Sequence, residues 1–343
     1  MYNNIFYTYL YAWYESNQRA LPWRETTNPY YIWISEIILQ QTRVAQGMDY
    51  YLRFVQRFPT VLSLAEAEED DVLLLWQGLG YYSRARNLHR AAQLIAHNAI
   101  PNIVDGFPAD FEAIRMLPGV GDYTAGAIAS FAYNLPYPAL DGNVYRVLAR
   151  VHDDETIMDS GLGKRHFYQI AQQMLDSAHP RLFNSAIMEF GALYCTPLHP
   201  NCEQCPIAVF CQAYAHGTVH LLPVRKPRPR LKDRYLIYHI YITRTGETLI
   251  HRRTDNDVWK HLWEFVLEEV AEAKQMQCPC SHIQVRSYTH VLSHQRLHTQ
   301  FRIEVVNTLP NIAGTKPVSI HDLEDYAFSR LTLNFLKDFA LIK

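Results

Sequence analysis

Four cysteines lie close together near the middle of the chain, at Cys195, Cys202, Cys205 and Cys211, with the spacing C-x6-C-x2-C-x5-C. The short gaps allow one segment to fold around a single metal centre. Thiolates are soft ligands, and four of them suit an iron–sulfur cluster or a zinc ion. Zinc sites more often use two C-x2-C pairs, so the long first gap favours a 4Fe–4S cluster. A zinc site, disulfides or free thiols are the alternatives.

Length and composition narrow the class of protein. The chain has 343 residues, 48% of them apolar, which is enough for two domains with substantial cores. No stretch approaches the roughly 20 apolar residues of a membrane span, and the first residues lack the basic start of a secretory signal. Clustered cysteines suit a reducing compartment better than a disulfide scaffold, and Cys278 and Cys280 are interpreted as ordinary thiols. We therefore expect a cytoplasmic protein without a membrane association.

Charge is distributed unevenly along the chain. The net charge is −2, to which residues 1–220 contribute −7 and residues 221–343 contribute +5. A nucleic-acid partner would therefore have to contact local basic patches, because the overall field is not attractive. One candidate patch, in a stretch without acidic residues, contains Arg84, Arg86, His89 and Arg90. A solvated helix face is the alternative interpretation of this patch.

The pattern of residues changes near position 216. Residues 1–215 predict a mainly α domain, in which Gly and Pro separate most of the helices. Helices are predicted at 30–44, 48–57, 70–76, 83–97, 110–116, 122–133, 142–152, 164–177 and 181–194. Residues 216–231 are rich in prolines and charges and predict an extended linker. Apolar runs at 235–242 and 302–306 predict strands, so residues 232–343 predict a mixed domain.

Two glycines precede the helix that is predicted to begin near Asp122. They lie in the segment Leu117-Pro118-Gly119-Val120-Gly121. Glycines two positions apart let the backbone turn tightly and expose amide groups beside a helix N-terminus. Gly119, Val120 and Gly121 could therefore bind a phosphate group of DNA. A plain turn between two helices is the alternative interpretation.

Two acidic residues have surroundings that suit the cleavage of glycosidic bonds. On a helix, the neighbours of Glu36 are the mostly apolar Ile32, Trp33, Leu39 and Gln40. Burial there would raise the pKa of Glu36 and keep it protonated as a general acid, although most glutamates of such helices lie on the surface. Asp141 precedes a predicted helix, where it could be a simple cap or an ionised carboxylate beside a developing cation. A protonated acid paired with an ionised carboxylate is typical of enzymes that cleave such bonds.

Amide and aromatic side chains occur in two further short segments, Gln40-Gln41-Thr42 and Gly80-Tyr81-Tyr82. Such groups can wedge between nucleic-acid bases or stack on them. Taken singly, however, each is more often part of a core or a surface.

Together these segments resemble the MutY adenine DNA glycosylases of the endonuclease III-like helix-hairpin-helix superfamily. The matching segments occur in the order of the family and are LPWR (21–24), SEIILQQT (35–42), WQGLGYYSRARNLH (76–89), LPGVGDYTAGAI (117–128), LDGNVYRVLAR (140–150) and the cysteine set. Residues 232–343 resemble the Nudix-like C-terminal domain of the same family. The resemblance implies a helix-hairpin-helix glycosylase domain, with a six-helix barrel and a cluster module, followed by an α+β domain.

The resemblance also implies roles for individual residues. Glu36 matches the catalytic acid that protonates adenine, Asp141 matches the carboxylate that stabilises the sugar cation, and Asn143 matches a residue that supports the attacking water. The residues that match the adenine pocket are Trp23, Arg24 and Leu39. Those that match side chains entering the base stack near the lesion are Gln41 and Tyr81.

Tyr123 distinguishes two branches of the superfamily. In the lyase branch, a lysine follows the hairpin at this position and forms a Schiff base, which a phenol cannot do. We therefore expect a monofunctional glycosylase that leaves an abasic site.

Two positions depart from the pattern of the family. Ser185 stands where the family usually has Gln or Glu, so a water is expected to replace one contact to adenine. The Phe-Ser-His loop of the C-terminal domain is replaced by Leu292-Ser293-His294, in which Ser293 and His294 can still hydrogen-bond to an oxidised guanine. Because the Nudix hydrolase box is missing, the C-terminal domain is expected to recognise a base and not to hydrolyse nucleotides.

The sequence therefore predicts a DNA repair enzyme, expected to be a monomer, that acts at the nucleoid of a bacterial cytoplasm. It is expected to remove adenine paired with 8-oxoguanine or guanine from double-stranded DNA. If the protein is an enzyme, the alternative activities are excision of thymine from G·T mismatches and excision of oxidised pyrimidines. A DNA-binding protein that carries a cluster but has no catalytic activity is the alternative of a different class. DNA contacts are expected from Arg84, Arg86, Arg90 and the basic linker.

Overall fold

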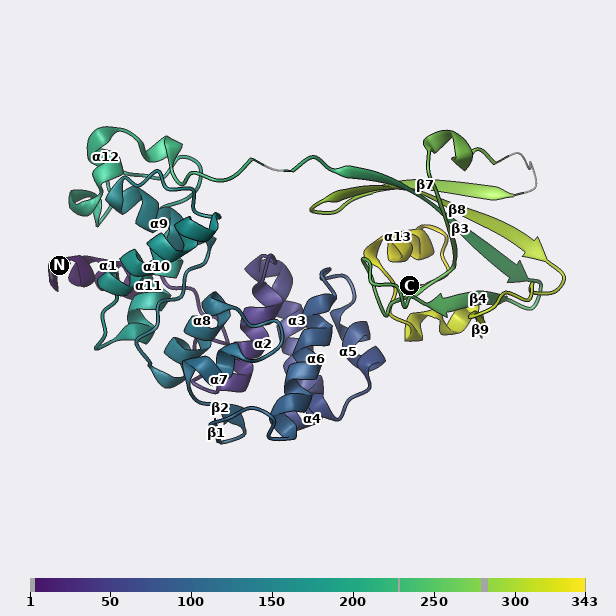
Figure 1. The fold of residues 1–343 in the computed structure, drawn as a ribbon, viewed down its shortest axis with the longest axis horizontal. Coiled ribbons are helices and arrows are strands. Elements are labelled where there is room, and N and C mark those ends of the chain that lie inside the picture. Colours follow the sequence, from purple (N-terminus) through teal and green to yellow (C-terminus); the bar gives the residue numbers. More distant parts are fainter. Residues whose placement is uncertain (1–3, 228, 279–282, 343) are drawn as a thin grey trace. The chain divides into compact units, whose positions relative to one another are not determined.

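The chain forms two compact units, which are drawn in Figure 1. The computed structural model describes residues 4–227, 229–278 and 283–342. The first unit consists of Met1–Glu66 and Arg90–Pro227, and the second of Ala67–His89 and Arg228–Lys343.

The division after Pro227 lies within the stretch that is expected to be a linker. The expected domain boundaries differ from the structure in one respect, since they assign Ala67–His89 to the helical domain. Arg228 of the expected linker, and Cys280, lie outside the described residues.

The first unit is built almost entirely of helices (Figure 1). They are α1 (Asn4–Asn17), α2 (Pro29–Leu39), α3 (Val44–Arg57), α4 (Val61–Ala65), α7 (Phe111–Arg115), α8 (Asp122–Tyr133), α9 (Gly142–His152), α10 (Gly161–Met174), α11 (Pro180–Leu193) and α12 (Gln212–His216), with a small hairpin of β1 (Ile103–Val104) and β2 (Phe107–Pro108) and the 3₁₀ turns η1 (Ala208–Phe210) and η2 (Val219–Leu221). The helices predicted between residues 110 and 194 are confirmed as α7 to α11. No helix of the described residues is long and apolar enough to cross a membrane.

The helix predicted over 30–44 is shorter than expected. Asn28 caps its start by accepting a hydrogen bond from the Tyr30 amide at 2.9 Å, and Pro29 supplies the fixed φ of a first helical turn. The helix ends at Leu39, because Gln40 leaves the helical conformation and Gln41 takes a left-handed φ of 60°. This break creates an exposed turn at Gln41 before α3 begins.

Helices α7 and α8 form the hairpin that the glycine pattern predicts. Gly119 has a φ of 79°, which a residue with a side chain rarely adopts, and the Val120 amide donates to the Leu117 carbonyl at 3.0 Å. Gly121 is the N-cap of α8 and supplies no capping side chain. Within the described residues, the first amide groups of α8 therefore receive no capping hydrogen bond from a side chain at the N-cap.

A shared apolar core fixes the cysteine segment to the helices that bear candidate site residues. Phe6, Leu10 and Tyr14 of α1 belong to one buried cluster with residues of α9, α10 and α11. Cys195, Cys205 and Cys211 pack against the same cluster. The position of the cysteines therefore depends on the packing of α9 and α11. The sequence analysis missed α1.

The described part of the second unit contains two sheets and a C-terminal helix (Figure 1). Its strands are β3 (Lys232–Thr243), β4 (Glu247–Arg252), β5 (Trp263–Glu264), β6 (Val266–Val270), β7 (Gln284–Val291), β8 (Gln295–Val306) and β9 (Lys316–Ser319). Strands β3 and β8 pair in parallel within a sheet of order β6-β3-β8-β7, and the second sheet has the order β5-β4-β9. The strands predicted at 235–242 and 302–306 are confirmed as parts of β3 and β8.

Helix α13 (Arg330–Asp338) covers one face of the larger sheet. Phe335 of this helix stacks on Phe301 of β8, with ring centroids 4.3 Å apart. Two further 3₁₀ turns, η3 (Ala273–Met276) and η4 (Ile320–Asp325), complete the described part of the unit. The combination of helical and sheet-rich units agrees with the fold class that the sequence predicts.

Helix α5 (Glu69–Trp76) and the first half of α6 (Ser83–Ala96) belong to the second unit, although they precede its strands by more than a hundred residues. The Tyr82 hydroxyl donates to the Phe328 carbonyl at 3.1 Å, and the Phe328 amide donates to Gln77 Oε1 at 3.0 Å. Glu69 lies 2.9 Å from the Arg252 guanidinium and 2.7 Å from His261 Nδ1. These polar contacts attach the segment to the loops around β4, β5 and α13.

The predicted basic patch on α6 is wrong for two of its members. Arg84 is only 9% exposed, because its guanidinium packs over the Trp76 ring and donates to the Gly80 carbonyl at 3.1 Å. His89 is also buried. Arg86 is half-buried and donates to the Lys260 carbonyl at 2.7 Å, so of this group only Arg90 is exposed.

The packing of α8 generates a test of the fold. A Cβ added at Gly126 would lie 2.5 Å from the Pro138 carbonyl oxygen, whereas one added at Gly161 meets nothing within 4 Å. We expect Gly126→Ala to lower the free energy of unfolding by about 1–3 kcal/mol through overpacking. Gly161→Ala, the control, should be neutral or slightly stabilising because alanine is the better helix former. Denaturant titration followed by far-ultraviolet circular dichroism measures both, and equal stability of the two variants would contradict this packing.

Candidate active site

One cleft in the first unit brings together most of the residues that the sequence analysis selects. Its lining comes from the loop before α2, from α2, from the turn after it, and from α8, α9, α10 and α11. The selected residues among this lining are Trp23, Arg24, Glu36, Leu39, Gln41, Gly121, Tyr123, Asp141, Asn143 and Ser185. Segments more than a hundred residues apart therefore meet in one place.

Glu36 is buried at the floor of this cleft, as its apolar helix neighbours predict. It is 7% exposed, and its Oε2 accepts a hydrogen bond from the Tyr123 hydroxyl at 2.7 Å. Burial raises the pKa of Glu36 to about 7, an effect opposed by the Tyr123 hydrogen bond, increased by the negative charge of Asp141 and reduced by Arg24. Near neutral pH, Glu36 can therefore hold a proton and release it.

Asp141 is the N-cap of α9 and faces the same cleft. Its Oδ1 accepts hydrogen bonds from the amides of Asn143 at 2.9 Å and Val144 at 2.8 Å, and its Oδ2 accepts one from Asn143 Nδ2 at 2.7 Å. Burial raises the pKa of Asp141 above its ordinary value, while these hydrogen bonds and the charge of Arg146 oppose the rise. Asp141 is thus both the cap of α9 and the candidate catalytic carboxylate, because the amide groups at the N-terminus of α9 that it caps also stabilise its negative charge.

Asn143 is held by a guanidinium that lies behind it. Arg146 Nη2 donates to Asn143 Oδ1 at 3.0 Å and to the Gly191 carbonyl at 2.5 Å, while Arg146 Nε donates to the Cys195 carbonyl at 2.8 Å. A Cβ added at Gly191 would lie 2.8 Å from the Asn143 carbonyl oxygen, so α11 can approach α9 only with glycine at this position. Arg146 therefore connects Asn143 to the backbone of Cys195, the first of the four clustered cysteines.

An acidic residue that the sequence analysis missed, Glu189 of α11, lies in the same cleft with no exposed surface. Its carboxylate lies 2.6 Å from Arg19 Nη2 and 2.7 Å from Arg24 Nη2. Burial alone would raise its pKa, but the hydrogen bonds of both arginines lower the pKa to about 2. Its position among apolar residues of a predicted helix was the available signal.

The pair with Glu189 leaves one donor of Arg24 unused. Nη1 of Arg24 is buried and has no hydrogen-bond partner within the described residues, although the side chain lines the cleft. Trp23, which is also buried, packs edge-to-face on Tyr51 with ring centroids 5.0 Å apart. This end of the cleft therefore combines an aromatic wall with a fixed hydrogen-bond donor.

Other selected residues lie in the second unit. Tyr81 is 48% exposed and has a left-handed φ of 48°, while Ser293 and His294 form the exposed tip of the hairpin between β7 and β8. The Tyr81 and Ser293 hydroxyls hydrogen-bond to each other. A segment near residue 80 and the hairpin near residue 293 thus present adjoining side chains on one unit.

Two adjacent glutamates, Glu268 and Glu269, lie on strand β6. Glu268 pairs with His239 at 3.0 Å, and Glu269 pairs with Arg234 at 2.6 Å. A strand directs successive side chains to opposite faces, so these two carboxylates do not point together at one metal.

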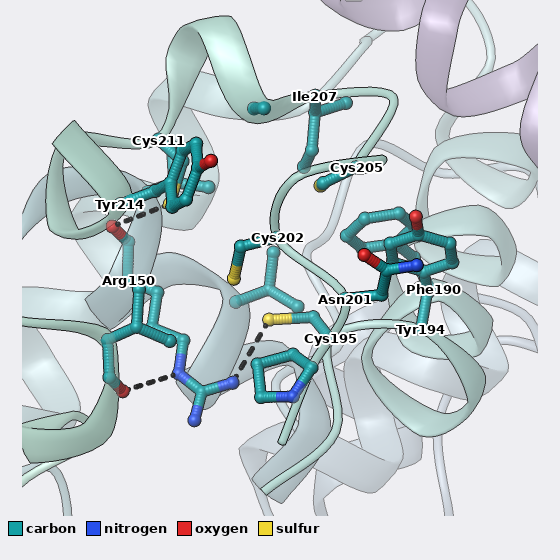
Figure 2. A pocket seen from close by; sticks show the side chains of 15 residues that line it. Arg150, Phe190, Tyr194, Cys195, Asn201, Cys202, Cys205, Ile207, Cys211 and Tyr214 are labelled. Atoms are coloured by element: carbon teal, nitrogen blue, oxygen red, sulfur yellow. Dashed lines mark hydrogen bonds between the residues drawn. The ribbon is translucent and has the colours of Figure 1, made fainter. Parts of the chain in front are cut away.

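The four cysteines line one pocket between α9, the end of α11 and the segment that leads to α12. Figure 2 shows their side chains around this pocket, with Arg150 beside Cys195 and Tyr194 and Phe190 on the opposite wall. Arg150 Nη1 donates to Cys195 Sγ at 3.4 Å, and the Cys211 thiol donates to the Arg150 carbonyl at 3.4 Å. All four are free thiols, so a disulfide framework is not formed. As placed, no group of three or more His, Cys, Asp or Glu side chains within the described ranges could hold a single metal ion.

Comparisons with known proteins agree with this site. Residues 34–167 match the family model of the HhH-GPD superfamily base excision DNA repair proteins, and residues 237–338 match the NUDIX domain model. The solved structure of a thermostable thymine-DNA glycosylase, 25% identical, superposes with a TM-score of 0.56 over 62% of this chain and 96% of that chain. An endonuclease III from a non-covalent DNA complex, 20% identical, gives a TM-score of 0.52 over 63% and 99% of the two chains and supports the fold.

Two curated relatives are named adenine DNA glycosylase. The adenine DNA glycosylase of Rattus norvegicus is 42% identical over 62% of this chain, but the match covers only 43% of the rat protein, so the chain spans less than half of that relative. The adenine DNA glycosylase of Buchnera aphidicola subsp. Schizaphis graminum is 30% identical over 94% of both chains. With a match along almost its whole length and a cleft that holds the residues of the resemblance, the chain belongs to the adenine DNA glycosylase family.

Proposed function

We propose that this protein removes adenine from double-stranded DNA in which the adenine faces 8-oxoguanine or guanine. The observation that carries the proposal is the pair of carboxyl groups in one cleft, of which Glu36 is buried and protonated near neutral pH and Asp141 is surrounded by hydrogen-bond donors. Hydrolysis of an N-glycosidic bond needs an acid for the leaving base and a negative charge for the sugar cation. The relatives named above are called adenine DNA glycosylases, which supports adenine as the base that leaves.

The geometry suggests a sequence of events. The adenine must leave the base stack to reach the cleft, at a cost of a few kcal/mol that is smaller at a mismatch. Glu36 then transfers its proton to the base and makes it a better leaving group. As the bond stretches, the charge of Asp141 offsets the positive charge that grows on the sugar. Asn143 and the deprotonated Glu36 orient the water that completes the hydrolysis.

Tyr123 supports a hydrolase without lyase activity. Its hydroxyl is used as a donor to Glu36, and a phenol cannot form a Schiff base with an opened sugar. The product is therefore expected to be an abasic site in an uncut strand. The Tyr123 hydrogen bond has a second effect, because it limits how far burial can raise the pKa of Glu36.

The adenine pocket is proposed at the end of the cleft formed by Trp23, Arg24 and Leu39. The unused Nη1 donor of Arg24 suits a ring nitrogen of the base, and the ion pair with Glu189 keeps the guanidinium in place. Ser185 lies on the same cleft and is too short to replace a Gln or Glu contact directly. A bridging water between Ser185 and the base is therefore expected.

Contacts to the bases around the lesion are proposed separately for each unit. Gln41 on its exposed turn and Tyr81 in its left-handed conformation are proposed to enter the base stack. Ser293 and His294 are proposed to hydrogen-bond to the oxidised guanine, and the hydrogen bond between the Ser293 and Tyr81 hydroxyls, which places these two side chains together on the second unit, supports the proposal. Gly119, Val120 and Gly121 of the hairpin are proposed to lie against a phosphate group, with the glycine amides as donors because the Val120 amide already donates to the Leu117 carbonyl.

A 4Fe–4S cluster is proposed in the pocket of the four cysteines. The four thiols are soft donors gathered around one pocket, and the long first interval of their spacing favours a cluster over zinc. A cluster offers one iron to each thiolate and so suits four cysteines that surround a pocket. Cys195, Cys202, Cys205 and Cys211 would hold it, and its contribution there is to tie the C-terminal segment of the first unit together.

A single-turnover assay tests the activity directly. Duplex oligonucleotides containing A·8-oxoguanine, A·G, G·T or an oxidised pyrimidine are incubated with excess protein, and base release is measured after alkaline cleavage of abasic sites. We expect adenine release from the first two, with a rate that falls as pH rises through about 7 and Glu36 loses its proton. Borohydride should trap no covalent adduct, since Tyr123 replaces the lysine.

Glu36→Gln is the matched variant for this assay. It should bind the A·8-oxoguanine duplex and release adenine at least about a thousandfold more slowly, a loss within the range attributed to general acid catalysis. Excision of thymine alone, or binding without any excision by the wild-type protein, would favour the alternatives that the sequence left open. Release by the variant at the wild-type rate would remove Glu36 from the mechanism.

The raised pKa of Glu36 also predicts how stability depends on pH. The folded pKa of about 7 exceeds the ordinary value of 4.5, so unfolding releases a proton between these two values and stability falls as pH rises from 4.5 to 7. At pH 8 the burial of the ionised Glu36 therefore lowers the free energy of unfolding by about 3 kcal/mol relative to its value at pH 4. Glu36→Gln should therefore be more stable than the wild type at pH 8, with the difference vanishing at pH 4. Denaturant titrations at both pH values measure this, with the exposed Glu155→Gln as a control that should show no pH-dependent gain.

The proposed cluster predicts the metal content of the purified protein. Anaerobically purified protein should contain about four irons and four sulfides per chain, with broad visible absorption, whereas a zinc site would give about one zinc. Cys202→Ser should lose most of the iron and destabilise the first unit. Cys278→Ser, the control outside the cysteine set, should keep the wild-type iron content. Zinc without sulfide in the wild type would contradict the assignment.

A further inference from the structure

Two basic side chains flank the Asp141 end of the cleft. Lys164, near the start of α10, lines the cleft together with Gly142 and Asn143. The Arg225 guanidinium lies beside Gly142, since a Cβ added at Gly142 would be 4.0 Å from Arg225 Nη2. Both side chains are exposed, and neither has a hydrogen bond or ion pair to another described residue.

The backbone on both sides of Arg225 is attached to the first unit. The Met158 amide donates to the Val224 carbonyl at 3.1 Å, and the Lys226 amide donates to Asp159 Oδ1 at 3.0 Å. The residues that make these contacts directly precede α10 in the chain. Residues 224–226 of the expected linker are therefore hydrogen-bonded to the first unit. These bonds place Arg225 on the side of the cleft where α10 begins.

The charge around Arg225 suits an anion. Residues 1–220 carry a net charge of −7, yet this rim presents two unpaired cations. An arginine at an exposed site with a second cation nearby is a favourable place for a phosphate group.

We propose that Arg225 and Lys164 bind the backbone phosphates that flank the extruded nucleotide and so hold its sugar against Asp141. The inference rests on the proposed function in taking DNA as the substrate. Contacts to phosphates fix the position and register of a strand and do not read its bases. Arg225 and Lys164 are thus positioning residues that provide a local attraction for DNA on an acidic unit. Neither residue touches the bond that breaks.

Salt-dependent binding tests this proposal on the full-length protein. The probe is a duplex with a tetrahydrofuran abasic analogue opposite 8-oxoguanine, which cannot be cleaved. Arg225→Ala and Lys164→Ala should each weaken binding by about threefold or more and reduce the slope of log K against log salt by about 0.9, the value for one phosphate contact. Arg225→Lys should keep most of the slope. Arg165→Ala, an exposed neighbour of Lys164 that is not among the residues lining the cleft, is the matched control and should change neither quantity.

A neutral phosphate identifies the contact itself. The same duplex is prepared with a methylphosphonate at the phosphate on the 5′ or the 3′ side of the abasic analogue. If Arg225 binds one of these phosphates, removing the charge of that phosphate already removes the interaction. Arg225→Ala should then weaken binding to the unmodified duplex but cause no further loss of affinity for the duplex with the neutral phosphate, which is the test of a double-mutant cycle. An unchanged slope for Arg225→Ala, or the same loss of affinity on all three duplexes, would overturn the proposal.

These measurements separate the two hypotheses, because the probe contains no adenine and requires no catalysis. If the wild type releases thymine instead of adenine while the cycle shows coupling to one phosphate, the substrate assignment fails and the phosphate contact stands. If adenine is released but no coupling is found at either phosphate, the contact fails and the proposed function stands. In single-turnover assays, Arg225→Ala should lower the rate of base release even at saturating protein, since the sugar is held less firmly.

Discussion

The buried guanidinium of Arg146 connects three parts of the first unit. It donates to Asn143 at the start of α9, to Gly191 near the end of α11 and to the Cys195 carbonyl. A hydrogen bond that involves a charged group contributes about 1.5–3 kcal/mol to stability. The orientation of Asn143, the close approach of the two helices and the start of the cysteine segment therefore depend on one side chain.

The cleft contains three acidic side chains whose environments differ. Glu36 has mainly apolar neighbours and one neutral donor, so its pKa is raised to about 7. Glu189 is also buried, but two arginines bring its pKa down to about 2. Burial raises the pKa of Asp141 as well, and the donors at the N-terminus of α9 oppose the rise. The carboxyl groups thus differ in how far hydrogen-bond donors and nearby charges offset the effect of burial.

Local sequence patterns predicted the features that depend on neighbouring residues. The apolar positions around Glu36 indicated its burial, the glycines before Asp122 indicated the hairpin, and the place of Asp141 indicated a helix cap. The roles of these residues in catalysis stay predictions. The Gln40–Gln41 break was not anticipated because a left-handed glutamine leaves no signal in the periodicity.

Features that depend on distant parts of the chain were not predictable in this way. The partners of Glu189 lie more than 160 residues before it, so its helix pattern alone did not show why a buried acid is tolerated. Arg84 was assigned to a basic surface because charge patterns do not reveal that its guanidinium covers Trp76. The attachment of Ala67–His89 to C-terminal residues likewise requires contacts such as Tyr82 with Phe328.

That attachment has a consequence for any attempt to divide the molecule. Cutting the chain after Pro227 would remove the partners of Glu69, Gln77 and Tyr82 and leave the inner side of α5 facing water. A truncated helical fragment would then lose order locally, around the very loop that carries Tyr81, even if the rest of its core stayed folded. Residues from Ala67–His89 and from the chain after Pro227 therefore build one compact unit, and a cut at this apparent boundary divides that unit.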